Sequence, residues 1–356
     1  MSDKSNRRSF LRRLAVVSGT AAAAPFLGFA NMFKEDTNST LSDMNPIKNI
    51  KPLGFQWETA DPFLFCVHHE DAFPKGNEMM GPSNEHFKGR HMGDDFIIKD
   101  GFRMYHGKTV PGFPGHPHRG FETITVVRKG IVDHADSLGA AGRYGDGDVQ
   151  WMTAGKGVQH SEMFPLIKTA EENPMELFQI WLNLPKAKKM VEPHFKMLWR
   201  DVIPNHQHVD INNKKTNVEV IAGTLFDKKA ATPPPNSWAA DEKNEVAVWN
   251  IKMEAGATFT LPKASEGVNR NIYFYEGSTL KLASQDITKY SAVELVPNQD
   301  IALQAGAEEV SILVLQGKPI AEPVMQYGPF VMNTQTEIME AFKDYQQGKM
   351  GVLIEA

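Results

Sequence analysis

Short apolar runs recur along most of the chain, and glycine, proline, asparagine or aspartate separates them. Runs of this length with regularly spaced turn residues are typical of β-strands in a sandwich or barrel, and unlike alternating βα units. The first half has such runs at residues 63–67, 121–127, 131–135, 149–152 and 177–182. The second half has them at residues 218–222, 246–251, 271–275, 292–296 and 310–315. The pattern predicts an all-β fold with two similar domains.

One clear helix is predicted near the C-terminus. Thr334 and Glu337 have the spacing of a capping box, and Gly348 stands where such a helix should end. The apolar face of this helix is formed by Ile338, Ala341, Phe342 and Tyr345. We expect this face to pack against a β domain.

Length, charge and cysteine content narrow the possibilities. A chain of 356 residues exceeds the size at which a single core stops growing, so we expect two domains, at residues 51–198 and 199–356. The net charge is −5, and −9 without the first 30 residues, which argues against nucleic-acid binding. Cys66, the single cysteine, is expected to be a small buried residue. Any metal must therefore be held by histidine, aspartate or glutamate.

The first 30 residues have the organisation of an export signal. Residues 7–11 read RRSFL, and an uncharged stretch rich in alanine follows at residues 14–29, which resembles a twin-arginine signal. A basic surface helix or a membrane anchor is the alternative, but this stretch is shorter than the roughly 20 residues that span a membrane. We expect the twin-arginine export machinery as a partner, a periplasmic or otherwise exported location, no membrane span in the mature protein, and a linker at residues 31–50.

Two pairs of potential metal ligands occupy alternate positions: His116 with His118, and His160 with Glu162. Alternate side chains of a strand point to one face, and a curled sheet can bring the two pairs face to face. Three imidazoles and a carboxylate suit Fe(II), Mn, Co, Ni, Cu(II) or Zn better than Ca or Mg. Pro117 cannot donate to a central ladder, so the first pair should lie at a strand start or a sheet edge.

Four stretches resemble the pirin family of the cupin superfamily: HPHRGFETIT from His116, GDVQWMTAGKGVQHSEM from Gly147, MVEP from Met190, and EPVMQYGPFVMNT from Glu322. The resemblance implies two stacked cupin (jelly-roll) β-barrels, with one metal, usually Fe(II), in the N-terminal barrel. His116, His118, His160 and Glu162 match the ligands of that metal.

The family resemblance has two departures. Most pirins are intracellular, whereas this chain carries an export signal. The segment from His68 to His106 is longer than usual, and it is either a lid over the metal or a solvated loop.

Several further side chains are candidates for the surroundings of the metal. His134 matches a pirin position near the metal, where it would hydrogen-bond a ligand or contact substrate. An aromatic substrate needs apolar walls, for which the candidates are Phe113, Phe121, Trp151 and Met163. For Phe121 and Trp151, packing in the core is the alternative.

A second His-x-His pair, His206 and His208, lies in a polar stretch without a partner pair and is expected in a surface loop. No histidine follows His208, and the later candidates for ligand positions are Asn269 and Asn271. The second barrel is therefore expected to be metal-free.

The resemblance implies a quercetin 2,3-dioxygenase-like oxygenase, because several pirins open flavonols with dioxygen. Glu162 would then leave the metal to accept the proton of an enolisable aromatic substrate. The alternatives are a non-catalytic, metal-dependent binding protein and a scaffold with a structural metal. Oxygen uptake with quercetin separates the first hypothesis from the other two.

Overall fold

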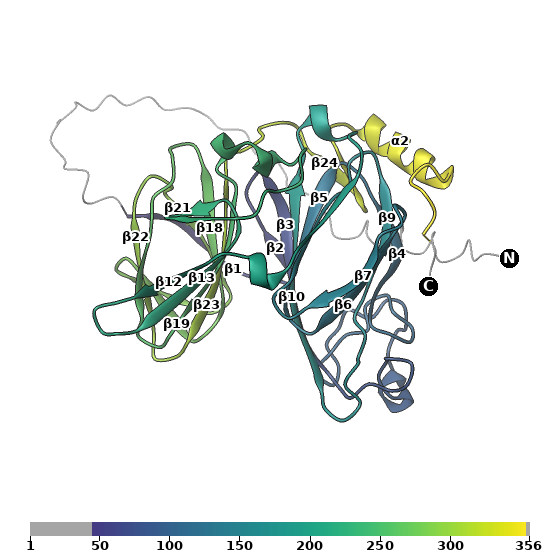
Figure 1. The fold of residues 1–356 in the computed structure, drawn as a ribbon, viewed down its shortest axis with the longest axis horizontal. Helices are drawn as coiled ribbons and strands as arrows, with labels where there is room; N and C mark the ends of the chain where they lie inside the picture. The colour runs from purple at the N-terminus through teal and green to yellow at the C-terminus, as the bar shows by residue number, and fades with distance from the viewer. Residues whose placement is uncertain (1–44, 354–356) are drawn as a thin grey trace, which may run out of the picture.

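The computed structural model describes residues 45–353 and contains two β-barrels side by side (Figure 1). The first barrel has a six-stranded sheet in the order β11-β8-β5-β10-β3-β2 and a four-stranded sheet in the order β4-β9-β6-β7. The strands of the larger sheet are β2 (Gln56–Glu58), β3 (Phe63–Phe73), β5 (Phe121–Lys129), β8 (Val149–Thr153), β10 (Asn173–Asn183) and β11 (His194–Leu198). The strands of the smaller sheet are β4 (Gly112–His118), β6 (Ile131–Asp136), β7 (Ala141–Gly145) and β9 (Val158–Met163).

The second barrel repeats this plan with a seven-stranded sheet, β1-β21-β18-β23-β16-β13-β12, and a four-stranded sheet, β17-β22-β19-β20. The larger sheet contains β1 (Ile47–Pro52), β12 (Asn205–Val209), β13 (Lys215–Ala222), β16 (Ala247–Met253), β18 (Asn269–Glu276), β21 (Ser291–Leu295) and β23 (Val310–Gly317). The smaller sheet contains β17 (Thr258–Leu261), β19 (Thr279–Leu282), β20 (Gln285–Thr288) and β22 (Ile301–Ala305). All ten predicted apolar runs coincide with these strands to within one residue, and the predicted fold class is confirmed.

Three short elements lie outside these sheets. They are the hairpin of β14 (Thr224–Leu225) and β15 (Lys228–Lys229), the hairpin of β24 (Met325–Tyr327) and β25 (Phe330–Met332), and helix α2 (Gln335–Gln346). Short 3-10 turns cover Asn84–Phe87, Lys186–Lys188, Arg200–Val202, Trp238–Ala240 and Glu242–Asn244. The Thr334–Glu337 capping box of α2 is present, as predicted.

The two large sheets pack face to face and share one hydrophobic core. This core draws side chains from both barrels, and Trp57 stacks on Tyr273 with ring centroids 5.3 Å apart. Cys66 is fully buried in it, as predicted. Trp151 is also fully buried there, so the prediction that it lines the metal pocket is wrong. The strands of these two packed sheets are buried on both faces. An apolar residue type therefore does not show on which face of the strand the side chain lies.

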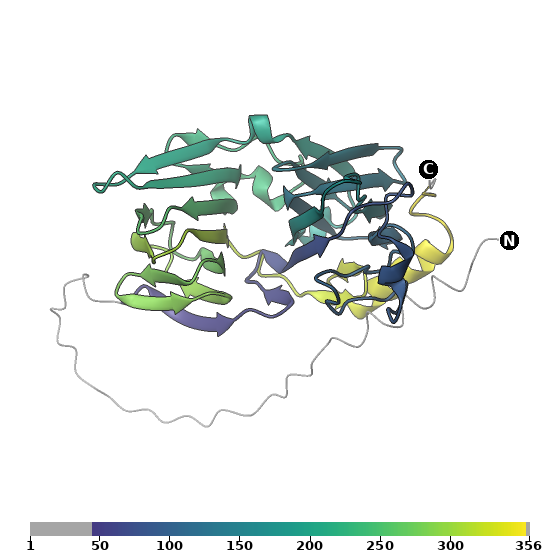
Figure 2. The ribbon, with the colours of Figure 1, turned by 90° about the horizontal axis from the view of Figure 1, so that it is seen from below.

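Each end of the described chain packs against the barrel that is farther from it in sequence (Figure 2). Strand β1 precedes the first barrel in sequence but pairs with β21 of the second, from Ile47 opposite Leu295 to Pro52 opposite Ser291. The predicted linker therefore ends before Ile47, not at residue 50. At the other end, β24, β25 and α2 lie against the first barrel, so the predicted boundary at residues 198/199 does not separate the packing units.

The long segment between β3 and β4 packs on the first barrel through an apolar cluster. Phe102, Met104 and Tyr105 are fully buried in a cluster with Phe73 and Phe164. The part of the segment at residues 102–105 is therefore packed against the barrel, whereas Met79, Ile97 and Ile98 in its earlier part are exposed.

The proposed twin-arginine signal at residues 1–30, and the linker up to residue 44, lie outside the described residues. Within residues 45–353, no helix is long and apolar enough to cross a membrane.

Candidate metal centre

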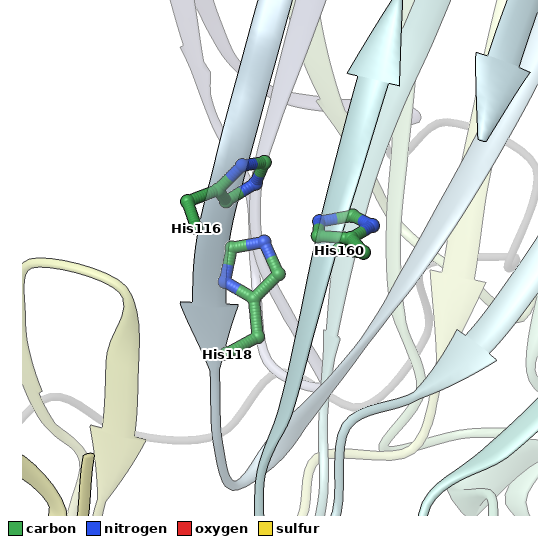
Figure 3. A group of neighbouring side chains, drawn as sticks. All are labelled: His116, His118 and His160. Carbon is green, nitrogen blue, oxygen red and sulfur yellow. The ribbon is translucent and has the colours of Figure 1, made fainter. Parts of the chain in front are cut away.

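Three histidines converge inside the first barrel (Figure 3). Strands β4 and β9 are antiparallel, and His116 stands directly opposite His160. His118 follows two residues later on the same face of β4. One ligand nitrogen from each ring lies within 4.8 Å of the other two, and all three side chains are buried. Strand β4 is an edge strand of its sheet, as predicted from Pro117.

The electrostatics of these histidines suit metal coordination. Burial lowers the pKa of His116 to about 4, and it lowers the pKa of His118 and His160 well below the usual value. The rings are therefore neutral near pH 7, which is the form that binds metal. Both ring nitrogens of His160 are buried without a hydrogen-bond partner among the described residues. A buried imidazole that has no hydrogen-bond partner and lies beside two other imidazoles fits a bound cation better than a packing role.

A backbone carbonyl from the far end of the chain orients one ligand. Nδ1 of His118 lies 3.4 Å from the carbonyl oxygen of Pro329, in the turn between β24 and β25. Nδ1 of His116 lies 3.0 Å from the carbonyl oxygen of Pro114. A hydrogen bond from Nδ1–H to a carbonyl fixes the tautomer that presents Nε2 to a metal. The C-terminal hairpin is therefore part of the surroundings of this site.

Glu162 lies beside the three histidines but outside the group whose ligand atoms are mutually within 4.8 Å. Its Oε2 is 3.8 Å from Nε2 of His160. Thr125 donates a hydrogen bond of 3.0 Å to Oε1, and Gln179 donates one of 2.8 Å to Oε2. Burial raises the pKa of this carboxyl group. The carboxylate is thus held by two donors within reach of the metal position.

His134 adjoins the site, as its family position implies. It stands opposite Glu162 in the pairing of β6 with β9, and its ring centroid is 5.4 Å from that of His160. Its Nε2 lies 3.2 Å from Oδ2 of Asp136, and Phe195 stacks on the ring. These contacts place His134 beside the ligands and hold it in one orientation.

Aromatic rings form one wall of the site. Phe121 stacks on Trp181 with centroids 3.9 Å apart, and the rings of both lie about 5 Å from His118, at 5.0 and 5.2 Å. Phe65, which is only half buried, packs on Trp181 with centroids 4.3 Å apart. The ring centroid of Phe113 lies 6.3 Å from that of His116. Phe113 and Phe121, two of the candidates for apolar walls, therefore each lie beside a histidine of the group.

Other predictions about the pocket need correction or addition. Met163 directly follows Glu162 on β9, so it points to the opposite face and not into the site. Phe65, Trp181, Thr125 and Gln179 were not predicted. Phe65 and Trp181 lie on β3 and β10, and the residues that alternate with them fill the core between the barrels. Only the pairing register shows which face of these strands points into the first barrel.

His206 and His208 lie on β12, an edge strand of the second barrel, so the predicted surface loop is wrong. Their rings contact Phe226 and Phe259. Among residues 45–353, the three-histidine group is the one cluster with metal-ligand geometry.

A buried lysine joins the C-terminal hairpin to the site. Nζ of Lys189 donates to the carbonyl oxygens of Gly120 and Val331, at 2.7 and 3.1 Å, and to Oδ1 of Asn183 at 2.6 Å. Replacing Lys189 with methionine removes this donor from the carbonyl oxygens of Gly120 and Val331, while Oδ1 of Asn183 keeps the backbone nitrogen of Leu184 as a donor. We therefore expect a loss of about 3 kcal/mol of unfolding free energy. Urea unfolding measures the loss, with the exposed Lys281→Met as control. Equal stability of both variants would contradict this role.

Comparisons with known proteins place these features in a family. The pirin family model matches residues 48–182, and the model of the pirin C-terminal cupin domain matches residues 248–351. A pirin-like protein of Caulobacter vibrioides is 34% identical over 259 residues, which cover 72% of this chain and 88% of that protein. Rat pirin is 34% identical over 265 residues, which cover 72% of this chain and 83% of that protein.

A solved structure gives the same result. The crystal structure of quercetin 2,3-dioxygenase from Acinetobacter baumannii superposes with a TM-score of 0.68 at 26% identity. The match covers 88% of this chain and 100% of that one.

Proposed function

The chain belongs to the pirin family, and from this we propose that it is a metal-dependent dioxygenase acting on quercetin-like flavonols or other enolisable aromatic compounds. The observation that carries the proposal is the group of three buried, neutral histidines with a hydrogen-bonded carboxylate beside it. The similarity to the Acinetobacter baumannii quercetin 2,3-dioxygenase supports the choice of reaction. The signal-like N-terminus favours action outside the cytoplasm.

We assign the metal position to His116, His118 and His160, with Glu162 as a fourth and exchangeable ligand. The donor set suits Fe(II) and also Mn, Co, Ni, Cu or Zn. A bound metal would supply Lewis acidity and open positions for the substrate and dioxygen. The Pro329 carbonyl keeps the His118 ring in place through its hydrogen bond.

Glu162 is the proposed proton acceptor. Its oxygens are fixed by Thr125 and Gln179, and burial raises the pKa of the carboxyl group, which strengthens it as a base. The proton of a substrate enol placed beside His160 would pass to this carboxylate. The two donors hold the carboxylate for that transfer.

The aromatic wall favours substrates that are flat and aromatic. Trp181 lies beside His118, and the half-buried Phe65 extends the aromatic surface from Trp181, so a flat multi-ring compound can pack along this wall. We predict that Trp181→Leu raises KM for quercetin about tenfold and leaves metal content unchanged. Steady-state kinetics with elemental analysis tests this, with the exposed Trp199→Leu as control. An unchanged KM would remove the wall from substrate recognition.

The direct test is oxygen uptake by protein loaded anaerobically with Fe(II). We expect uptake and ring opening when quercetin is added with air. Loaded protein that consumes no oxygen with quercetin or other enolisable aromatic compounds would favour a non-catalytic binding or scaffold role.

A further inference from the structure

The inner face of the second barrel is apolar except at one end. Its strands β17 and β22 correspond in pairing to β4 and β9, but they turn Phe259, Leu261, Ile301 and Leu303 inward. The exception is Arg270 on β18, which is 1% exposed. Arg270 alternates with Ile272 and Phe274, both in the barrel core, so its side chain belongs to the inner face.

The position of Arg270 corresponds to the metal end of the first barrel. Arg270 stands opposite Gln316 of β23, which also stands opposite Ala247 of β16. In the first barrel, the matching pair of strands sets Phe121 opposite Asn183, and Phe121 contacts His118. The two barrels thus place their unusual inward side chains at the same end of the same fold.

The polar atoms of this end lack partners. Nε, Nη1 and Nη2 of Arg270 form no hydrogen bond among the described residues, and neither do Nε1 of Trp249 and Oε1 of Gln316. Trp249 is on the same inner face, two residues from Ala247 along β16. The unpaired set therefore contains four donor nitrogens and one acceptor oxygen.

The nearest carboxylates are already engaged elsewhere. Asp300 accepts from the backbone nitrogen of Lys263 at 2.7 Å, and Glu245 accepts from that of Ser265 at 3.1 Å. Glu245 also lies 3.8 Å from Nζ of Lys318. Both carboxylates favour the charged form of Arg270, but neither forms an ion pair with it among the described residues. Burial lowers the pKa of Arg270 to about 10, so the guanidinium is still charged near pH 7.

A buried charge without a partner is costly, and such groups are normally paired. Four donors and one acceptor call for an acceptor-rich ligand, and a carboxylate matches the planar fork of a guanidinium. A single arginine near two acidic residues does not suit a dianion such as phosphate. We propose that the second barrel binds a small monocarboxylate, its carboxylate paired with Arg270.

The test uses benzoate as the probe, because it is a small monocarboxylate with a single negative charge. Isothermal titration is carried out on the full chain, both metal-loaded and treated with EDTA. We expect Arg270→Met to weaken benzoate binding at least tenfold in both forms. The matched control is Arg143→Met, which removes an exposed arginine of the first barrel that pairs with Asp133, and it should bind as the wild type does.

A crystal soaked with 4-bromobenzoate provides a readout that needs no variant. We expect an anomalous bromine peak inside the second barrel, with the carboxylate on the Arg270 guanidinium. A peak confined to the metal centre or the surface, equal benzoate binding by Arg270→Met, or no binding by the wild type would overturn the proposal. None of these outcomes depends on oxygenase activity, so the site and the proposed reaction can fail separately.

Discussion

Replacing His160 with alanine is expected to abolish stoichiometric metal binding while the fold remains intact. His160 is the one histidine of the group on β9, with its ring centroid 4.4 Å from that of His116 and 4.8 Å from that of His118. The variant keeps only two histidines of one strand and the exchangeable Glu162, so metal affinity should fall at least a hundredfold. The fold should persist because hydrophobic burial in two barrels dominates stability. Elemental analysis beside circular dichroism measures both effects.

The matched control for this variant is His208→Ala, since His208 lies on an edge strand of the second barrel. It should bind one metal per chain, as the wild type does. Unfolding of His160→Ala together with metal loss would show instead that the metal is structural. Full metal content in His160→Ala would place the metal elsewhere.

Replacing Glu162 with glutamine should separate metal binding from turnover. The amide keeps the size of the carboxyl group and an acceptor for Thr125, and three histidines remain to hold the metal. It cannot accept a proton near pH 7, so we expect kcat with quercetin to fall by about 100- to 10,000-fold. Most of the bound metal should remain, as elemental analysis would show.

The control for the second variant is the exposed Glu192→Gln, which pairs with Lys156 on the surface. Its kcat should equal that of the wild type. Wild-type turnover by Glu162→Gln would remove the proton-acceptor role, and loss of all metal would make Glu162 an indispensable ligand instead.

The sequence was sufficient to predict features that depend on local spacing. Alternation placed His116 and His118 on one face, and Pro117 placed their strand at a sheet edge, where it lies. The capping box at Thr334 defined the start of α2. These features need only neighbouring residues, because the pleat and the first helical turn are set locally.

The features that sequence reasoning missed depend on contacts between distant segments. The Pro329 carbonyl reaches His118 across 211 positions, and β1 pairs with a strand of the other barrel. No local pattern encodes such partners. Trp151 was misplaced because both faces of β8 are buried, and burial alone does not tell which face holds the metal. Trp181 was missed for the same reason.

The central claim is that His116, His118 and His160 bind one metal ion with Glu162 beside it. An anomalous difference map of crystals of the Fe(II)-loaded protein, recorded on both sides of the iron absorption edge, tests it directly. We expect one strong peak within coordinating distance of the three imidazoles, and none in the second barrel. A map without a peak among these histidines would contradict it.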